Sequence, residues 1–170
     1  LLLVTVLSVA LFIIKILHSP VYFTFSDEFT HWRTAADILQ TGKVFQPNPL
    51  LPISSLYPGL EIVSSALVSI TGLSVFAVGN LILLLGRVVL AISLFLLYER
   101  ISQSARVAGL AMLIYSANPN YLFFTSQYSY ESLSLPLMAL TLYLASTSVN
   151  WTTFGSKLRL TVLGTLLIAS

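Results

Sequence analysis

The chain has 170 residues, of which 56% are hydrophobic and only 8% are charged. Soluble domains carry about 25% charged residues, so a chain this poor in charge cannot cover a water-facing surface. The net charge of +2 gives no reason to expect nucleic acid as a partner, and the absence of cysteine excludes disulfides, zinc thiolates and thiol nucleophiles. We therefore expect an all-α, multi-pass bundle of membrane-spanning helices.

Apolar runs that suit a bilayer recur along the chain, because a helix needs about 20 apolar residues to cross one. The expected spans lie at about residues 1–18, 74–98, 104–118, 131–147 and 160–170. The strongest run is interrupted only by Gly86-Arg87. Because both ends of the sequence look like cuts within a longer protein, we expect the chain to be an N-terminal piece of one.

The segment 19–73 is more polar, holds several prolines and is expected to form a long loop outside the membrane. Within it, apolar residues recur every three to four positions and predict an amphipathic helix over 27–40. Ser26 is its predicted N-cap and Gly42 its predicted stop. A second short helix is expected to end at Gly72.

The basic residues predict the orientation, because Lys and Arg accumulate in cytoplasmic loops. The connections 99–106 and 150–159 each hold two basic residues, and both lie on one side if the two runs between them are separate spans. The loop 19–73 and the connection 118–130 then share the extracytoplasmic face.

Two adjacent carboxylates, Asp27 and Glu28, follow the first expected span. A positioned carboxylate can take a proton from an acceptor hydroxyl, so both are candidate catalytic residues. The structural alternative is that acids in the first turn of a helix interact favourably with its dipole, by about 0.3–1 kcal/mol. The pair taken alone favours this alternative.

Glu131 stands at the expected outer start of the span 131–147, on the same face as Asp27 and Glu28. An acid at membrane depth is costly and usually functional. Three such acids could hold a divalent cation such as Mg²⁺ or Mn²⁺, and Asp27 and Glu131 are the candidate ligands. For Glu131, too, the alternative is an acid at a helix start.

Four further residues are candidate substrate contacts: His31, Trp32, Tyr57 and Arg87. His31 shares a helix face with Glu28 and could bind a phosphate, although a Glu–His surface pair is the favoured alternative. Trp32 could stack on a sugar ring or anchor the chain at the membrane interface. Arg87 must pair with an acid, with backbone carbonyls or with a lipid phosphate, and a structural role between helices is favoured.

Two other charged residues are given structural roles. Glu61 follows Tyr57-Pro58-Gly59 and is expected to cap its helix. Lys15 stands near the end of the first span, where it could attract a lipid phosphate, although we expect its side chain only to extend toward the membrane surface.

Several motifs recur in an order that resembles a known class. They are Ser26-Asp27-Glu28-Phe29-Thr30-His31-Trp32, the helix 35–43 that ends at Gly42, Leu56-Tyr57-Pro58-Gly59-Leu60, and Ile70-Thr71-Gly72-Leu73. Over most of residues 1–147 this succession resembles the membrane part of GT-C glycosyltransferases, the class of the protein O-mannosyltransferases (glycosyltransferase family 39) and the lipid A aminoarabinose transferases.

The resemblance implies transfer of a sugar from a polyprenyl-phosphate donor to a protein, lipid or glycan at the extracytoplasmic membrane face. It also implies Asp27 or Glu28 as catalytic base and Glu131 as a second acid. Many relatives carry Pro-Pro where this chain has Pro58-Gly59. Two hypotheses compete with this one. In the first, the chain is a segment of a transporter or flippase, and the acids and Arg87 line its pathway. In the second, the chain is a non-catalytic membrane scaffold.

Overall fold

A computed structural model describes residues 1–147, so the expected span 160–170 and the basic connection 150–159 lie outside the described residues. The described part of the chain contains helices and connecting loops and no strand, which confirms the all-α expectation. Its elements are α1 (Leu2–His18), α2 (Ser26–Thr41), the 3₁₀ helix η1 (Pro52–Leu56), α3 (Gly59–Thr71), α4 (Val75–Ser102), α5 (Ala105–Ser116), α6 (Pro119–Leu122), the 3₁₀ helix η2 (Phe124–Ser126) and α7 (Tyr130–Thr147).

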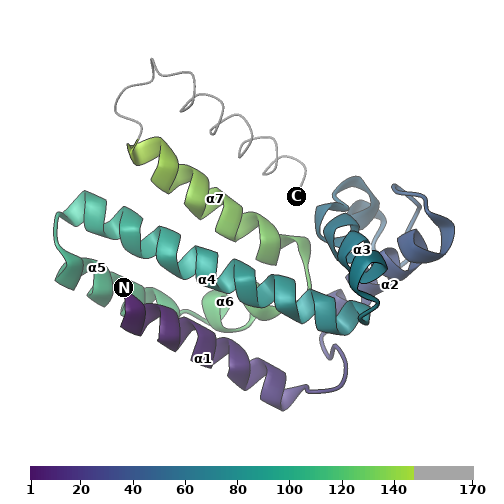
Figure 1. Ribbon diagram of the computed structural model, residues 1–170, viewed down its shortest axis with the longest axis horizontal. Coiled ribbons are helices and arrows are strands. Elements are labelled where there is room, and N and C mark those ends of the chain that lie inside the picture. Colours follow the sequence, from purple (N-terminus) through teal and green to yellow (C-terminus); the bar gives the residue numbers. More distant parts are fainter. Residues whose placement is uncertain (148–170) are drawn as a thin grey trace.

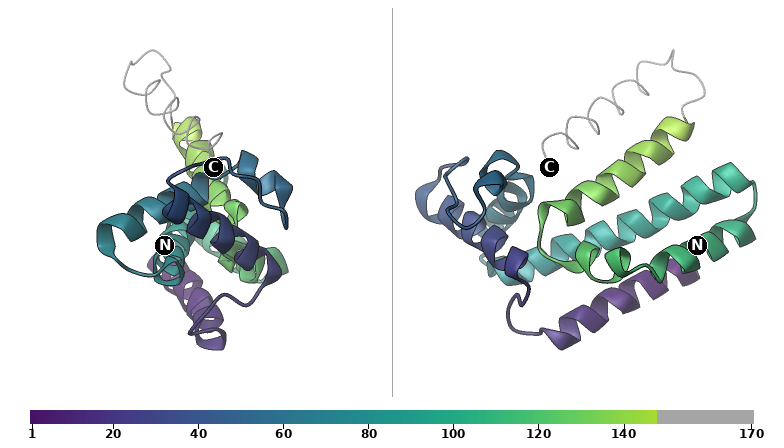
Figure 2. Two further views of the ribbon diagram at one scale, coloured as in Figure 1. Left: turned by 90° about the vertical axis from the view of Figure 1, so that its right-hand side faces the viewer. Right: turned by 180° about the vertical axis from the view of Figure 1, so that it is seen from behind.

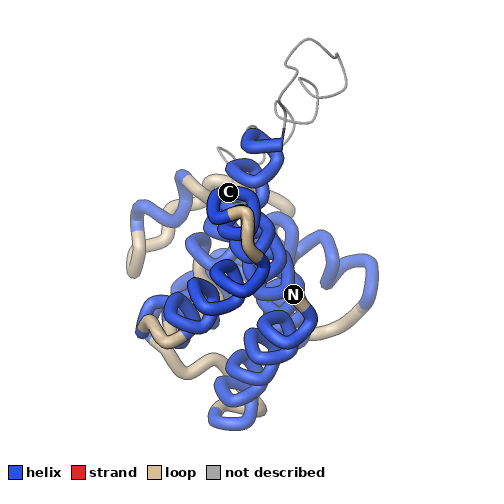
Figure 3. The backbone as a smooth tube through the Cα atoms, turned by 90° about the vertical axis from the view of Figure 1, so that its left-hand side faces the viewer, coloured by secondary structure: helices blue, strands red, loops and turns tan. Residues whose placement is uncertain are grey.

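The long helix α4 lies at the centre of the arrangement (Figure 1) and packs against α1, α5 and α7. Seen from behind, α1 and α7 lie on opposite sides of it (Figure 2). The helices α2 and α3 pack against each other at the end where α4 begins. We call residues 19–73, which contain α2, η1 and α3, the cap. Loops occur mainly where the long helices end (Figure 3).

One described helix, α4, is long and apolar enough to cross a membrane. Its 28 residues correspond to about 42 Å at 1.5 Å per residue. It continues without a break through Gly86 and Arg87. The apolar helices α1, α3 and α5 are shorter, with 17, 13 and 12 residues. The runs expected as spans within residues 1–147 do form helices, and their passage through a membrane stays a prediction.

Local signals account for several helix ends. Gly42 and Gly72 end α2 and α3 with φ of +66° and +71°, a backbone conformation that glycine adopts without steric cost. Ser104 caps the start of α5, where its hydroxyl oxygen accepts a hydrogen bond from the Val107 amide, as its position before the apolar run indicates. The predicted N-cap Ser26 is wrong by one residue, because α2 begins at Ser26 and Phe25 stands before it.

The buried apolar residues form separate clusters along α4. The cluster nearest the cap contains Phe12, Phe23, Ala35, Leu60, Val75, Val78, Ile82, Leu83 and Tyr128. Gly79 makes the approach of Tyr128 to α4 possible, since a Cβ at this position would lie 2.8 Å from the Tyr128 ring. A second cluster, farther along α4, contains Val4, Ala91, Phe95, Ala108 and Met112.

Candidate functional site

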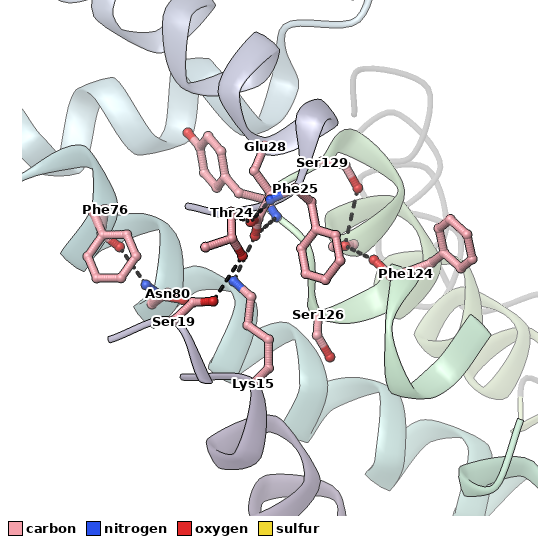
Figure 4. Close-up of polar contacts among 12 residues, drawn as sticks. Lys15, Ser19, Thr24, Phe25, Glu28, Phe76, Asn80, Phe124, Ser126 and Ser129 are labelled. Atoms are coloured by element: carbon pink, nitrogen blue, oxygen red, sulfur yellow. Dashed lines mark hydrogen bonds and ion pairs between the residues drawn. The ribbon is translucent and has the colours of Figure 1, made fainter. Parts of the chain in front are cut away.

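Glu28 is fully buried where the end of α1, the start of α2 and the segment before α7 meet (Figure 4). Its Oε1 accepts from Lys15 Nζ at 2.7 Å and from the Tyr128 amide at 3.0 Å. Its Oε2 accepts from the amides of Thr24 at 3.0 Å and Phe25 at 3.2 Å. Four donors thus surround one carboxylate, which makes Glu28 a crosslink between three segments and removes it from contact with a substrate.

Aromatic side chains shield this ion pair from water. Lys15 Nζ lies 5.6 Å from the centre of the Phe23 ring, and Phe23 stacks on Tyr128 with their ring centres 4.8 Å apart. Phe76 meets Phe23 edge-on at 5.1 Å. The expectation that Lys15 extends toward the membrane surface is therefore wrong, because the buried carboxylate of Glu28 offers the ammonium a closer charge. The signal in the sequence was a lone cation beside an apolar run, with an acid shortly after it.

Asp27 has the opposite surroundings although it is the next residue along the helix. It is exposed, and its carboxylate has no hydrogen bond or ion pair with any described residue; only its backbone carbonyl is engaged, by the Thr30 hydroxyl. The two acids predicted as one reactive pair therefore differ in availability. Asp27 can meet a substrate at the start of α2, and Glu28 holds that start in place.

A second buried pair joins α2 to α3. His31 Nδ1 lies 2.5 Å from Glu61 Oε1, with the two side chains 1% and 0% exposed. Two expectations are wrong here: His31 does not form a surface pair with Glu28, and Glu61 does more than cap its helix. The reason is that α2 and α3 pack face to face, which brings together residues 30 positions apart.

The surroundings of this pair contain two polar atoms that lack a hydrogen-bond partner among the described residues, Glu61 Oε2 and the Tyr128 hydroxyl. Burial raises the pKa of the Tyr128 phenol well above its usual range. Tyr128 therefore stays a neutral hydroxyl. Because His31 is buried, the structure favours a positioning role for it over the predicted contact with substrate.

Two neighbouring cavities are lined in part by residues of the first turns of α7. One, of about 240 Å³, is lined by Ile53, Tyr57, Tyr130 and Ser134. The other, of about 500 Å³, is lined by Asn120, Phe124, Thr125, Glu131, Ser134 and Leu135. Ser134 lines both, so the two cavities adjoin. Tyr57 is 47% exposed, and the Tyr130 ring meets the His31 ring edge-on at 5.3 Å between centres, which connects the smaller cavity to the buried pair.

Glu131 is exposed in the first turn of α7. The bond from the Tyr128 amide to Glu28 holds the segment before α7 against the start of α2, and the membrane face on which both lie stays a prediction. Within residues 1–147, however, no three His, Cys, Asp or Glu side chains form a group that could hold a metal ion. The three acids are thus not gathered into one cluster, and binding of a cation by Asp27 and Glu131 stays a prediction.

Trp32 is 44% exposed on the surface of α2. It lies one residue beyond the buried His31, so the two side chains leave the helix in different directions. The exposed ring is available both for stacking on a ligand and for a place at a membrane interface. The contacts of Trp32 do not distinguish between these two functions.

Arg87 is 1% exposed in the middle of α4. Its Nη1 donates to the Tyr121 carbonyl, to the Thr125 hydroxyl and, at 3.3 Å, to the Ser126 hydroxyl. Its guanidinium carbon lies 3.7 Å from the centre of the Tyr121 ring. The predicted pairing with a backbone carbonyl between helices is confirmed, and Arg87 binds the α6–η2 segment to α4.

Comparison with models of known protein families, with curated proteins and with solved structures finds no match for this chain. A function must therefore be argued from the residues of the cap and from the two cavities at the start of α7.

Proposed function

We propose that this protein is a multi-pass membrane enzyme that transfers a sugar from a polyprenyl-phosphate donor to an acceptor hydroxyl at the extracytoplasmic face. The observation that carries the proposal is the difference between two adjacent acids. Glu28 is bound by four donors, while Asp27 presents at the same end of the bundle a carboxylate without a partner among residues 1–147. A general base must lie within about 2.6–3.2 Å of the proton that it removes, and Asp27 is open to such an approach.

In this mechanism the acceptor hydroxyl attacks the anomeric carbon of the donor. Asp27 takes the hydroxyl proton as the new carbon–oxygen bond forms. The bond between the anomeric carbon and the phosphate oxygen breaks, and the polyprenyl phosphate leaves with the electron pair. Attack from the face opposite to the leaving group inverts the anomeric configuration. Glu28 acts through position only, since it fixes the turn that carries Asp27.

The cavity beside Glu131 suits the sugar of such a donor. Asn120, Thr125 and Ser134 offer polar groups along its wall, and Phe124 offers an aromatic ring. Sugar sites combine these features, because hydroxyl groups need hydrogen bonds and the C–H face of the ring packs on an aromatic side chain. Glu131 is then the second acid of the site and contacts the sugar.

The proposed topology places the cap outside and the α4–α5 connection in the cytoplasm. Single-cysteine labelling tests it directly, because the sequence contains no cysteine of its own. Thr30→Cys in the cap should react with a membrane-impermeant maleimide added outside intact cells. Gln103→Cys, between α4 and α5, should react only after the membrane is opened. Labelling of both from the same side would overturn the topology.

The base assignment is tested with Asp27→Asn in the full-length protein. The expected loss of transfer is about 10²–10⁴-fold, the usual contribution of general base catalysis. The measurement is transfer of radiolabelled sugars from a panel of polyprenyl-phosphate sugars to acceptors in membranes. Asp37→Asn, which removes another carboxylate of α2, is the matched control and should keep full transfer. Full activity in Asp27→Asn would overturn the assignment.

A further inference from the structure

The smaller of the two cavities at the start of α7 has no role in the mechanism above. It has a volume of about 240 Å³ and is lined by Ile53 and Tyr57 from the cap and by Tyr130 and Ser134 from α7. None of these four residues is charged, so the cavity offers little attraction to a phosphate or a carboxylate. It offers apolar and aromatic surface with a few hydroxyl groups, which is the usual lining of a site for a neutral small molecule.

The two tyrosine rings of this cavity lie beside each other without covering each other's faces. The centres of the Tyr57 and Tyr130 rings are 6.4 Å apart, and their planes are inclined by 37°. The stacked rings of Phe23 and Tyr128 are closer and more nearly parallel, at 4.8 Å and 17°. Tyr57 is also 47% exposed. The face of an aromatic ring is negative and attracts the weakly positive C–H groups of a sugar ring, so the two tyrosines offer a surface on which a sugar can stack.

A buried pair holds the Tyr130 ring in place. The His31 ring meets it edge-on, with the ring centres 5.3 Å apart and the planes at 72°. His31 is in turn bonded to Glu61 at 2.5 Å. A side chain that is fixed before binding loses little conformational freedom when a ligand arrives. The contact between α2 and α3 therefore gives the cavity a preformed wall.

The hydroxyl groups of the cavity are available to a ligand. The phenols of Tyr57 and Tyr130 make no hydrogen bond to another residue in the described range 1–147. Ser134 donates to the Glu131 carbonyl at 3.3 Å, which leaves its own oxygen able to accept. A hydrocarbon chain would cover these groups without bonding them, whereas a sugar offers each of them a hydroxyl partner.

The cavity adjoins both parts of the proposed reaction. Ser134 also lines the larger cavity, where the sugar of the donor is proposed to lie. Asp27 stands four residues before His31 on α2, and residues at this spacing share a helix face with their Cβ atoms about 5–6 Å apart. Because the His31 ring meets Tyr130, the smaller cavity lies next to the helix face that carries the proposed base.

We propose that the smaller cavity binds a sugar ring of a glycan, which stacks on Tyr57 and Tyr130 and exchanges hydrogen bonds with their hydroxyls. The role of this glycan as the acceptor rests on the proposed function, whose acceptor class it specifies. A serine or threonine side chain, the corresponding group of a protein acceptor, has no ring face to place on two tyrosines. The acceptor sugar in this cavity is then the neighbour of the donor sugar in the larger one.

The first test measures sugar binding in the absence of any donor, so it does not depend on transfer. The full-length protein is placed in lipid nanodiscs, because sugar-based detergents would compete for the cavity. Titration calorimetry uses methyl glycosides of disaccharides of glucose, mannose, galactose and N-acetylglucosamine, and a Ser/Thr-rich peptide. At least one disaccharide should bind, and the peptide should not. Binding of no disaccharide, or of the peptide alone, would overturn the proposal.

The stacking surface is tested with two substitutions of Tyr57. Tyr57→Leu removes the ring and should weaken disaccharide binding by about three- to tenfold, the usual worth of a stacking contact. Tyr57→Phe keeps the ring and should weaken binding less. Tyr22→Leu, at an exposed tyrosine of the cap that lines neither cavity, is the matched control and should bind as the wild type does. Equal affinity of Tyr57→Leu and the wild type would overturn the site.

Transfer assays with the same variants separate this proposal from the proposed function. The disaccharide that binds should also accept sugar from a polyprenyl-phosphate donor, and its KM should rise in Tyr57→Leu. Binding that depends on Tyr57, without transfer from any donor, would retain the sugar site and overturn the proposed function. Transfer to the Ser/Thr-rich peptide that is unchanged in Tyr57→Leu would retain the proposed function and overturn the glycan acceptor.

Discussion

The two ends of the helix bundle are stabilised by different interactions. At the cap, buried carboxylates are bound by an ammonium, an imidazole and backbone amides from distant segments. Toward the other end of α4, the buried cluster of Val4, Ala91, Phe95, Ala108 and Met112 is held by apolar packing. Removing one partner of a buried ion pair is strongly destabilising, while apolar contacts tolerate exchange of similar side chains. The comparison indicates that structural precision is concentrated where the candidate site lies.

The largest change in unfolding free energy is expected for a substitution at the cap. Glu28→Ala leaves the Lys15 ammonium and three backbone amides without their acceptor, which should lower the free energy of unfolding by about 3–5 kcal/mol. Chemical unfolding in detergent, followed by circular dichroism, measures it. Asp27→Ala is the matched control at the neighbouring residue and should cost no more than about 1 kcal/mol, the contribution of an exposed acid in the first turn of a helix. Equal destabilisation by the two substitutions would contradict the crosslinking role of Glu28.

The second prediction concerns the buried pair between α2 and α3. Glu61→Gln keeps the shape of the side chain and replaces its charge, so the bond to His31 becomes a neutral one. A loss of about 1–3 kcal/mol in unfolding free energy is expected. Glu99→Gln, near the other end of α4, is the control and should have a smaller effect. A larger effect at Glu99 would contradict the conclusion that interactions between charged groups stabilise mainly the cap end.

The third prediction compares the steric effect of an added methyl group at two glycines, Gly79 and Gly109. Gly79→Ala places a methyl group 2.8 Å from the Tyr128 ring. Overpacking of this kind costs about 1–3 kcal/mol. Gly109→Ala in α5 meets nothing within 4 Å, so it should stabilise the protein by about 0.5–1 kcal/mol through helix propensity. The two alanine variants should therefore shift the unfolding midpoint in opposite directions, and shifts of the same sign would contradict the packing described.

The smallest effect is expected within the apolar cluster. Met112→Leu exchanges two side chains of similar volume and should cost less than about 1.5 kcal/mol. The same unfolding assay measures it. A loss as large as that of Glu28→Ala would show that the two ends are equally specific.

The helix positions could be predicted because their signals are local. Gly42 and Gly72 end helices through their own backbone conformation, and Ser104 begins one through a bond three residues away. The apolar runs predicted the long helices to within a few residues. A one-residue error occurred at Ser26, where the carboxylate of Glu28 bonds the amide that precedes the helix.

The partners of the charged residues could not be predicted in the same way. His31 meets Glu61 only because two helices pack, and nothing in the spacing of Glu28 and His31 on one face reveals that contact. Lys15 reaches Glu28 across the turn between α1 and α2, which periodicity does not describe. The carboxylates of Glu28 and Glu61 are each bound by a residue from another helix. Only the structure therefore shows whether either carboxylate is available to a substrate.

The bonds of Glu28 also imply an order of assembly during synthesis. Lys15, Thr24 and Phe25 emerge from the ribosome before it, whereas the Tyr128 amide follows 100 residues later. Since chains are made from the N-terminus at about 5–20 residues per second, the last donor of the carboxylate is synthesised about 5–20 seconds after it. The cap therefore forms first without the Tyr128 amide, and the segment before α7 supplies this last hydrogen bond to Glu28. A chain truncated before residue 128 should be cut more readily by proteases within the cap.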